Sequence, residues 1–273
     1  MQSFKSYYFN DHDLLYFINK NLEAMEELKP REVPRALKPL SSYTYWSQGR
    51  KAIPDDVKSA LGKWRILIEK ETGMELNVYD KNLAKQFIYN YCPQYMMPFE
   101  TAFDYSIESN VFRMAYTKVF NCLWIDPDSE PTEYTQEVIR LSQLEQKSVI
   151  GLASAIDQKN RGPRVASRFF IANRNCRFFR DIRKKLENLD FRNFEKSRRT
   201  LGALADSGLY TKTLIEMVKR IHIQIRAEDG IFTFNKPDTL KPTMYAINIE
   251  KLSKNLTELE YKKTNTHWRN SLK

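Results

Sequence analysis

The sequence predicts an α/β fold with a mixed, mainly parallel central sheet and helices on both of its faces. Stretches with strand-like and helix-like apolar spacing alternate between residues 41 and 126, which is the order that βαβ units produce. With 273 residues, 42% of them hydrophobic and 29% charged, the chain can bury a large core. No internal repeat or low-complexity tract interrupts the pattern.

The first elements follow from the spacing of apolar residues. Residues 11–29 have helical spacing behind an acidic first turn, and three prolines then exclude regular structure up to a strand expected over 43–46. The next helix is expected over 53–73, where a proline and two aspartates mark the start and Gly73 the end. Its inner side is expected to carry Val57, Leu61, Trp64, Ile66 and Leu67.

The alternation continues through the rest of the chain. The following elements are a strand over 74–80, helices over 81–91 and 106–120, and a strand over 121–126. Beyond Glu130 the pattern is mixed. It contains a strand over 167–175, a basic amphipathic helix over 176–189, and a turn with a helix in 202–221.

The charge and the cysteine content limit the classes of partner and the cellular compartment that we expect. Lys and Arg outnumber Asp and Glu by 44 to 34, which favours nucleic acid, an anionic membrane surface or a phosphate-bearing small molecule as partner. The cysteines at 92, 122 and 176 lack zinc-site spacing and indicate reduced, buried thiols. No stretch has the apolar length of a membrane span or of a signal peptide, so we expect a cytoplasmic protein.

Two carboxylates stand at the end of the strand expected over 121–126. Asp126 and Asp128 flank Pro127, and residues two apart in an extended chain point the same way. The carboxyl ends of strands form the ligand-binding edge of an open parallel sheet. Paired carboxylates repel each other unless a cation lies between them, and oxygen ligands suit Mg²⁺ or Mn²⁺ that also touches a diphosphate. The alternative is a solvated turn.

The neighbourhood of this acidic pair resembles a known enzyme signature. The stretch ESNVFRMAYTKVFNCLWIDPD, residues 108–128, resembles that of A-type fold glycosyltransferases with a DXD motif. This group includes capsular polysaccharide synthesis proteins, yeast mannosyltransferases and clostridial toxin glycosyltransferases. Ser109 and Arg113 match the signature, and Asp126 follows Arg113 by thirteen residues, as the signature requires.

Three further stretches are similar to the same family. YTYWSQGRKAIPDDVKSALGKW (43–64) and MELNVYDKNLAKQF (74–87) resemble its opening strand and the segments that follow, and THWRNSLK (266–273) resembles its closing tail. The resemblance implies one Rossmann-like A-type fold. A helical extension over 1–40 would precede a glycosyltransferase domain over 41–273, which divides into a nucleotide-sugar half (41–130) and an acceptor-side half with the closing tail (131–273).

The resemblance also implies donor-binding residues. Trp46 would stack on the uracil of a UDP-sugar, and Asn110 and Arg113 would bind the donor sugar or its phosphates. Trp268 would close over the diphosphate. The alternatives are that Trp46 is a core residue, that Arg113 pairs with a carboxylate of its own helix, at Asp104 or Glu108, and that the tail is frayed.

The metal and the reaction follow from the same resemblance. Asp128 would bind Mn²⁺ or Mg²⁺ most directly, Asp126 would act through the metal or the donor ribose, and His267 would be a further ligand. The implied protein is a metal-dependent hexosyltransferase that retains the anomeric configuration. Its acceptor would be a glycan or lipid-linked glycan of bacterial capsule or another surface polysaccharide.

Three departures from the signature keep other functions open. Asn110 replaces the family aspartate, and Asn121 and Cys122 replace its two glycines, which allows a degenerate protein that binds without transfer. The basic helix over 176–189 packs on the sheet, contacts an acidic acceptor glycan, or contacts an anionic membrane from the cytoplasmic side. A nucleic-acid-binding module is less favoured because the positive charges are dispersed and no motif is present.

Overall fold

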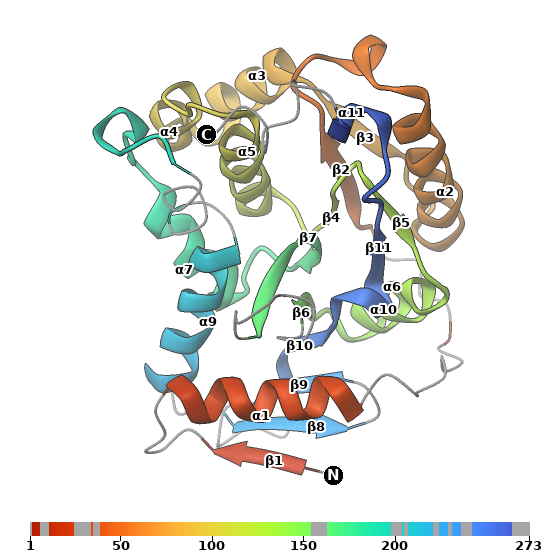
Figure 1. Cartoon of the computed structure of the whole chain (residues 1–273), viewed down its shortest axis with the longest axis vertical. Helices are drawn as coiled ribbons and strands as arrows, with labels where there is room; N and C mark the ends of the chain where they lie inside the picture. The colour runs from red at the N-terminus through yellow and green to blue at the C-terminus, as the bar shows by residue number, and fades with distance from the viewer. Residues whose placement is uncertain are drawn as a thin grey trace.

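A nine-stranded mixed sheet runs through the protein in a computed structural model of the chain (Figure 1). The structure describes residues 2–5, 11–24, 34, 39–153, 163–197, 204, 207–220, 224–228, 231–235 and 242–263. The strand order is β1-β8-β9-β10-β6-β7-β4-β2-β3. The strands are β1 (Gln2–Lys5), β2 (Ser41–Tyr45), β3 (Leu76–Tyr79), β4 (Cys122–Ile125), β6 (Ser148–Ala153), β7 (Arg164–Ala172), β8 (Gln224–Glu228), β9 (Ile231–Asn235) and β10 (Pro242–Asn248).

Most of the strands run in one direction. Strand β2 pairs in parallel with β3 and β4, and β6 pairs in parallel with β10. The remaining pairs are antiparallel. Strands β3, β2, β4, β6, β10 and β8 therefore point one way, and β7, β9 and β1 point the other way. The predicted α/β class with a mixed, mainly parallel sheet is confirmed.

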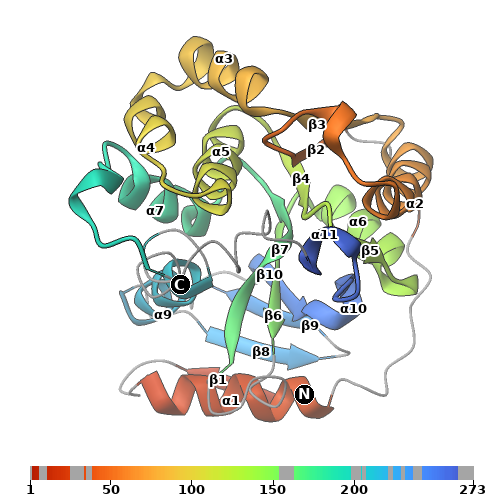
Figure 2. The same ribbon diagram turned by 45° about the horizontal axis from the view of Figure 1, so that its top comes forward.

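Helices cover both faces of this sheet. On one face lie α1 (Asp11–Ala24), α3 (Lys81–Tyr91), α5 (Tyr105–Val119), α7 (Arg177–Leu186) and α9 (Ser207–Arg220); on the other lie α2 (Asp55–Thr72), α6 (Glu133–Glu145) and α10 (Ile249–Leu252). Figure 2 shows α7 and α9 on one side of β6 and β7 and α2, α6 and α10 on the other. In β4, Trp124 joins the core cluster of the first face while Leu123 and Ile125 join that of the second, because successive strand residues point to opposite faces.

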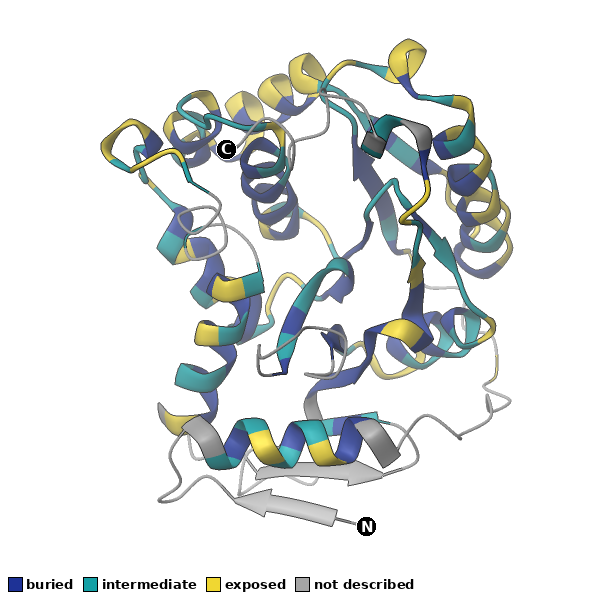
Figure 3. Ribbon diagram, in the orientation of Figure 1, coloured by how far each residue is buried: buried dark blue, intermediate teal, exposed yellow. Residues whose placement is uncertain are grey.

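Helix α2 shows how the local sequence sets these elements and where the expectation fails. Gly73 ends the helix in the left-handed conformation, with φ 68°, which glycine adopts at no steric cost. Val57, Leu61 and Trp64 are buried as expected, but Ile66 is 72% exposed, so its assignment to the inner side is wrong. Position 66 is two residues from Trp64, about 200° around the helix, and faces solvent; Figure 3 shows this exposed outer side.

Two elements described within the first forty residues contribute to the same sheet and core. Strand β1 pairs with β8, and α1 buries Leu14, Ile18 and Leu22 in the core cluster of the first face. The predicted helix over 11–29 is confirmed as far as Ala24, and its remaining residues lie outside the described part of the chain. The division at residue 40 stays a prediction. None of the described helices combines the length and the apolar character needed to cross a membrane.

Candidate functional site

A pocket of about 370 Å³ lies where β2 and β4 end. Its walls come from the last residue of β2 and the three residues after it (45–48), from the first turns of α5, from residues 126–128 after β4, and from Tyr261 on α11 (Glu260–Lys263). These segments meet because β2 and β4 are parallel neighbours whose carboxyl ends share one edge of the sheet. The structure thus brings together five residues singled out in the sequence, Trp46, Asn110, Arg113, Asp126 and Asp128.

The remaining predicted site residues are outside this description. His267 and Trp268 belong to the tail, and the structure describes the chain only as far as residue 263. Their expected roles at the metal and the diphosphate stay predictions.

Arg113 holds Asp126 at the wall of the pocket. Its Nη2 donates to Asp126 Oδ1 at 2.7 Å and its Nη1 to the carbonyl of Ser167 at 2.8 Å. The guanidinium carbon lies 4.2 Å from the centre of the Trp124 ring, and the Trp124 indole donates to the same carboxylate oxygen at 2.9 Å. With its side chain only 4% exposed, Arg113 pairs across the sheet edge with Asp126; Glu108 pairs with Lys81 instead.

Asp128 is held by the segment at the other end of the chain. Its Oδ2 accepts a hydrogen bond from the Tyr261 hydroxyl at 3.0 Å and lies 2.7 Å from Lys262 Nζ. Strands β5 (Ser129–Pro131) and β11 (Ser253–Asn255) form a small antiparallel sheet that brings this segment beside the acidic turn. The predicted pair of acids therefore shares one pocket, but each acid has its own cationic partner.

Glu108 is a third acid beneath the pocket. It is buried and accepts hydrogen bonds from the Tyr45 hydroxyl at 2.7 Å and from Ser47 Oγ at 3.0 Å, and it pairs with Lys81. Burial, and next the negative charge of Glu108, raise the pKa of Tyr45 far above its ordinary value, so this phenol remains a donor. The network fixes the wall that carries Trp46.

Several polar atoms of the pocket are buried without a hydrogen-bond partner among the described residues. They are Trp46 Nε1, Ser106 Oγ and Asn110 Oδ1. The Trp46 and Tyr261 rings form a T-shaped pair, with ring centres 5.3 Å apart and an angle of 76° between their planes. Buried polar groups in folded proteins are almost always paired. Two donors and an acceptor without partners in one pocket therefore point to a polar ligand.

The donor atoms around the acids fit a hard divalent cation. The Lys262 ammonium contacts Asp128 Oδ2, Asn255 Oδ1 and the carbonyl of Leu256, which are the oxygen types that bind Mg²⁺ and Mn²⁺. In the described part of the chain, no group of three or more His, Cys, Asp or Glu residues is placed to hold a metal. A cation here would take only one or two carboxylates, with its other ligands from neutral oxygens, water or substrate phosphates.

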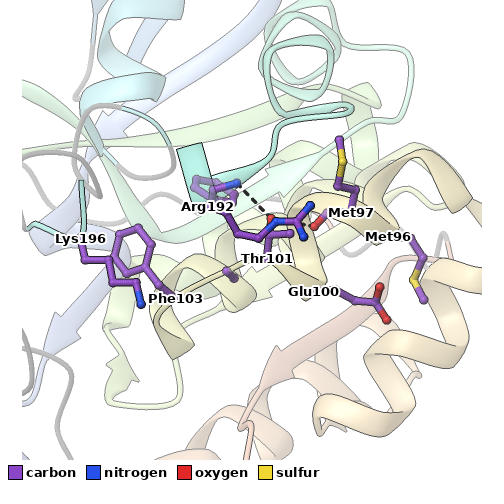
Figure 4. A pocket seen from close by; sticks show the side chains of 9 residues that line it. Met96, Met97, Glu100, Thr101, Phe103, Arg192 and Lys196 are labelled. Carbon is purple, nitrogen blue, oxygen red and sulfur yellow. Dashed lines mark hydrogen bonds between the residues drawn. The ribbon is translucent and has the colours of Figure 1, made fainter. Parts of the chain in front are cut away.

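A second pocket, of about 580 Å³, is lined in part by Thr101, Ala102 and Phe103. These residues precede Asp104, which caps α5 by accepting the Ser106 N–H at 2.7 Å. In Figure 4, Glu100 and Met96 lie on one side of Thr101, whereas Phe103 and Lys196 lie on its other side. The lining is mainly apolar, with three charged residues, Glu100, Arg192 and Lys196.

Some residues of the site were not anticipated from the sequence. Ser47, Lys81, Tyr261 and Lys262 surround the acids, but no local pattern marks them, because their partners lie 27 to 134 residues away in the chain. The aromatic and basic residues just before the predicted closing tail were the only available signal.

Neither the models of protein families nor the curated proteins include a match to this sequence.

Proposed function

We propose that the protein is a glycosyltransferase that takes a sugar from a nucleotide-sugar, most simply a UDP-sugar, and transfers it to a glycan. The observation that carries this proposal is the convergence of Trp46, Asn110, Arg113, Asp126 and Asp128 on one pocket at the carboxyl edge of the sheet. We infer an A-type glycosyltransferase fold from the same arrangement and the mixed sheet. The product would belong to bacterial capsule or another surface polysaccharide.

The donor would lie with its base at Trp46 and its diphosphate toward the acids. The indole Nε1 and the Asn110 carbonyl oxygen, both without partners among the described residues, would bind the polar edges of the nucleotide and of the sugar. An acceptor hydroxyl oxygen would form the new bond to the anomeric carbon while the bond to the diphosphate breaks; the nucleoside diphosphate would leave, and its departing oxygen would take the proton of the hydroxyl. Mn²⁺ or Mg²⁺, held by Asp128 and Asp126, would supply positive charge to that leaving group.

The acceptor would occupy the second pocket. Phe103 of this pocket lies two residues before Tyr105, which lines the first pocket, and we infer that a hydroxyl presented from it reaches the sugar of the donor. Phe103 offers a ring face, and Lys196 and Arg192 suit an anionic glycan. Phe103→Ala and Lys196→Glu should raise the KM for the acceptor while donor hydrolysis continues unchanged; an unaltered acceptor KM would exclude this pocket.

The central test is a screen of nucleotide-sugar hydrolysis and transfer with and without Mn²⁺. Asp128→Asn should abolish turnover, because the carboxylate that holds the cation becomes a neutral amide. Glu130→Gln, two residues further along the chain in β5 and paired with Lys63 at 2.7 Å, is the matched control and should keep full turnover. Normal turnover by the Asp128 variant would exclude the proposed site.

A second function is favoured by Asn110. An amide there binds a sugar hydroxyl but carries no charge, so the pocket can hold a nucleotide-sugar or a glycan without transfer. Calorimetry with UDP and Mn²⁺ that shows binding, together with no turnover on any donor, would select this binding function.

A further inference from the structure

The point beside Asp128 that suits a divalent cation is filled by an ammonium of the protein itself. Lys262 Nζ lies 2.7 Å from Asp128 Oδ2 and 3.3 Å from Asn255 Oδ1, and it also donates to the carbonyl of Leu256. Asn255 and Leu256 accept hydrogen bonds from this ammonium, and the Asp128 carboxylate lies at ion-pair distance from it. The Lys262 side chain is 11% exposed, so this is an enclosed contact.

A metal ion and this ammonium cannot share the carboxylate. Two positive centres within about 4 Å repel strongly in a partly buried site, and the repulsion doubles when one of them is divalent. Binding of Mn²⁺ or Mg²⁺ at Asp128 therefore requires Lys262 to leave. The ammonium group of Lys262 is at the end of a flexible four-carbon side chain. It lies on the segment that also carries Tyr261, a wall residue of the pocket.

We propose that Lys262 holds the place of the divalent cation in the ligand-free protein and exchanges with it at Asp128. In the free protein the ammonium offsets the charge of Asp128 beside Asp126, whose own partner is Arg113. When a metal arrives with a diphosphate, Lys262 moves from the carboxylate to the phosphate oxygens. Lys262 is then a positioning residue that keeps the metal affinity of the free protein low. This inference rests on the proposed function only in taking a divalent cation as the ligand of Asp128.

The test is a titration of Mn²⁺ into nucleotide-free protein. Binding is measured as the loss of the electron paramagnetic resonance signal of free Mn²⁺. Lys262→Met removes the competing charge and should tighten Mn²⁺ binding by about tenfold or more. Lys262→Gln, which keeps polar contact with Asn255 and Leu256, should show the same gain, and thermal unfolding verifies that both variants are folded. Lys262→Arg should bind Mn²⁺ as weakly as the unchanged protein.

The matched control is Lys63→Met. Lys63 pairs at 2.7 Å with Glu130 of β5, two residues after Asp128, but the Lys63 side chain is 54% exposed, so its removal changes the net charge equally without freeing Asp128. It should leave Mn²⁺ affinity unchanged within about twofold, because exposed charges are screened. An equal gain in Lys63→Met, or no gain in either neutral Lys262 variant, would overturn the proposal.

A UDP arm separates this result from the proposed function. UDP should tighten Mn²⁺ binding to the unchanged protein and have a smaller effect on Lys262→Met, from which the competing ammonium is absent. If UDP has no effect on any variant, the nucleotide-sugar function fails, while the gain in Lys262→Met still establishes the exchange. Addition of Asp128→Asn to Lys262→Met should remove the gain, and a gain that persists would place the metal elsewhere and overturn the exchange.

Discussion

Single side chains at the pocket edge each serve several partners. The Arg113 guanidinium binds a carboxylate, a carbonyl and a ring face at once, through Asp126, Ser167 and Trp124. The planar fork of arginine makes this possible, and a lysine with its single nitrogen cannot reproduce it. Trp46 has the opposite character, with a buried indole N–H that lacks a described partner. One residue supports the site, and the other is available to a ligand.

Replacing Arg113 should therefore cost stability as well as binding. Arg113→Met leaves the carboxylate of Asp126 without its cation, and we expect a loss of about 3 kcal/mol in the free energy of unfolding, at the low end for buried pairs because Asp126 is 25% exposed. Urea denaturation measures this loss. Arg113→Lys should recover less than half of it, and full recovery would contradict the need for a planar fork.

Trp46→Ala tests the ligand side of the pocket. Loss of the stacking face should weaken UDP binding by about 1–3 kcal/mol, which calorimetry measures. Tyr105→Ala is the matched control, since Tyr105 lines the same pocket but is 48% exposed, and it should change the affinity little. Equal losses in both variants would mean that Trp46 has no specific role in stacking.

At the scale of elements, buried ion pairs and close contacts fix the layers on the second face. Glu71 of α2 is fully buried and accepts hydrogen bonds from Arg140 of α6 at 2.6 and 3.1 Å. On the same face, Gly151 of β6 lies under Ile249 of α10, where an added Cβ would meet the Ile249 side chain at 2.4 Å. The two contacts join α2 to α6 and α10 to the sheet.

The Glu71–Arg140 pair predicts an asymmetric response to substitution. Arg140→Met should lower the free energy of unfolding by about 3–5 kcal/mol, because a buried carboxylate loses its partner. Lys58→Met, which removes an exposed pair with Asp55, should change it by less than about 0.5 kcal/mol. Denaturation of both variants under the same conditions checks the contrast, and similar effects would show that the buried pair is not special.

The contact at Gly151 predicts a clash and its rescue. Gly151→Ala should destabilise the protein by about 1–3 kcal/mol through overpacking. The methyl group that Ile249→Val removes is the atom closest to the new Cβ, so the double variant should regain part of the loss. Thermal unfolding of the two single variants and the double variant measures the coupling, and strictly additive effects would contradict the packing argument.

At the scale of the whole molecule, buried thiols and phenols that stay protonated determine how the free energy of unfolding changes with pH. Burial raises the pKa of the Cys92 thiol to about 12, from an ordinary value of 9.0. Burial likewise raises the pKa values of Cys122 and of the Tyr43, Tyr45 and Tyr116 phenols. The folded state therefore keeps protons that the unfolded chain releases above about pH 9, so alkali favours unfolding.

We expect stability to be lost on the alkaline side. Each such group should lower the free energy of unfolding by about 1.4 kcal/mol per pH unit once the pH exceeds its unfolded pKa. Below that pKa the contribution of Cys92 is fully present, and it is lost progressively between about pH 9 and 12. Urea midpoints from pH 7 to 11 measure the decline, and Cys92→Ala should make it shallower from pH 9 to 10. A flat profile would contradict the burial of these groups.

Much of the framework follows from local sequence patterns. The helix predicted over 81–91 has the same bounds as α3. The strand predicted over 121–126 is one residue longer than β4 at each end. Strands β8 and β9 were missed although Asp229 and Gly230 separate them, a dipeptide typical of two-residue hairpins. The alternation of residue types in QIRAE (224–228) and IFTFN (231–235) is a further signal for two strands.

The sequence by itself determined most of the elements over residues 41–130 and the place of Asp126 and Asp128 at a strand end, because periodicity and end signals act over a few residues. Tertiary structure alone decided that Arg113 turns to Asp126 and that Lys262 lies on Asp128, 134 residues away. The chain can satisfy a charge with any nearby partner, and only the strand order and the β5–β11 pairing decide which partner is near.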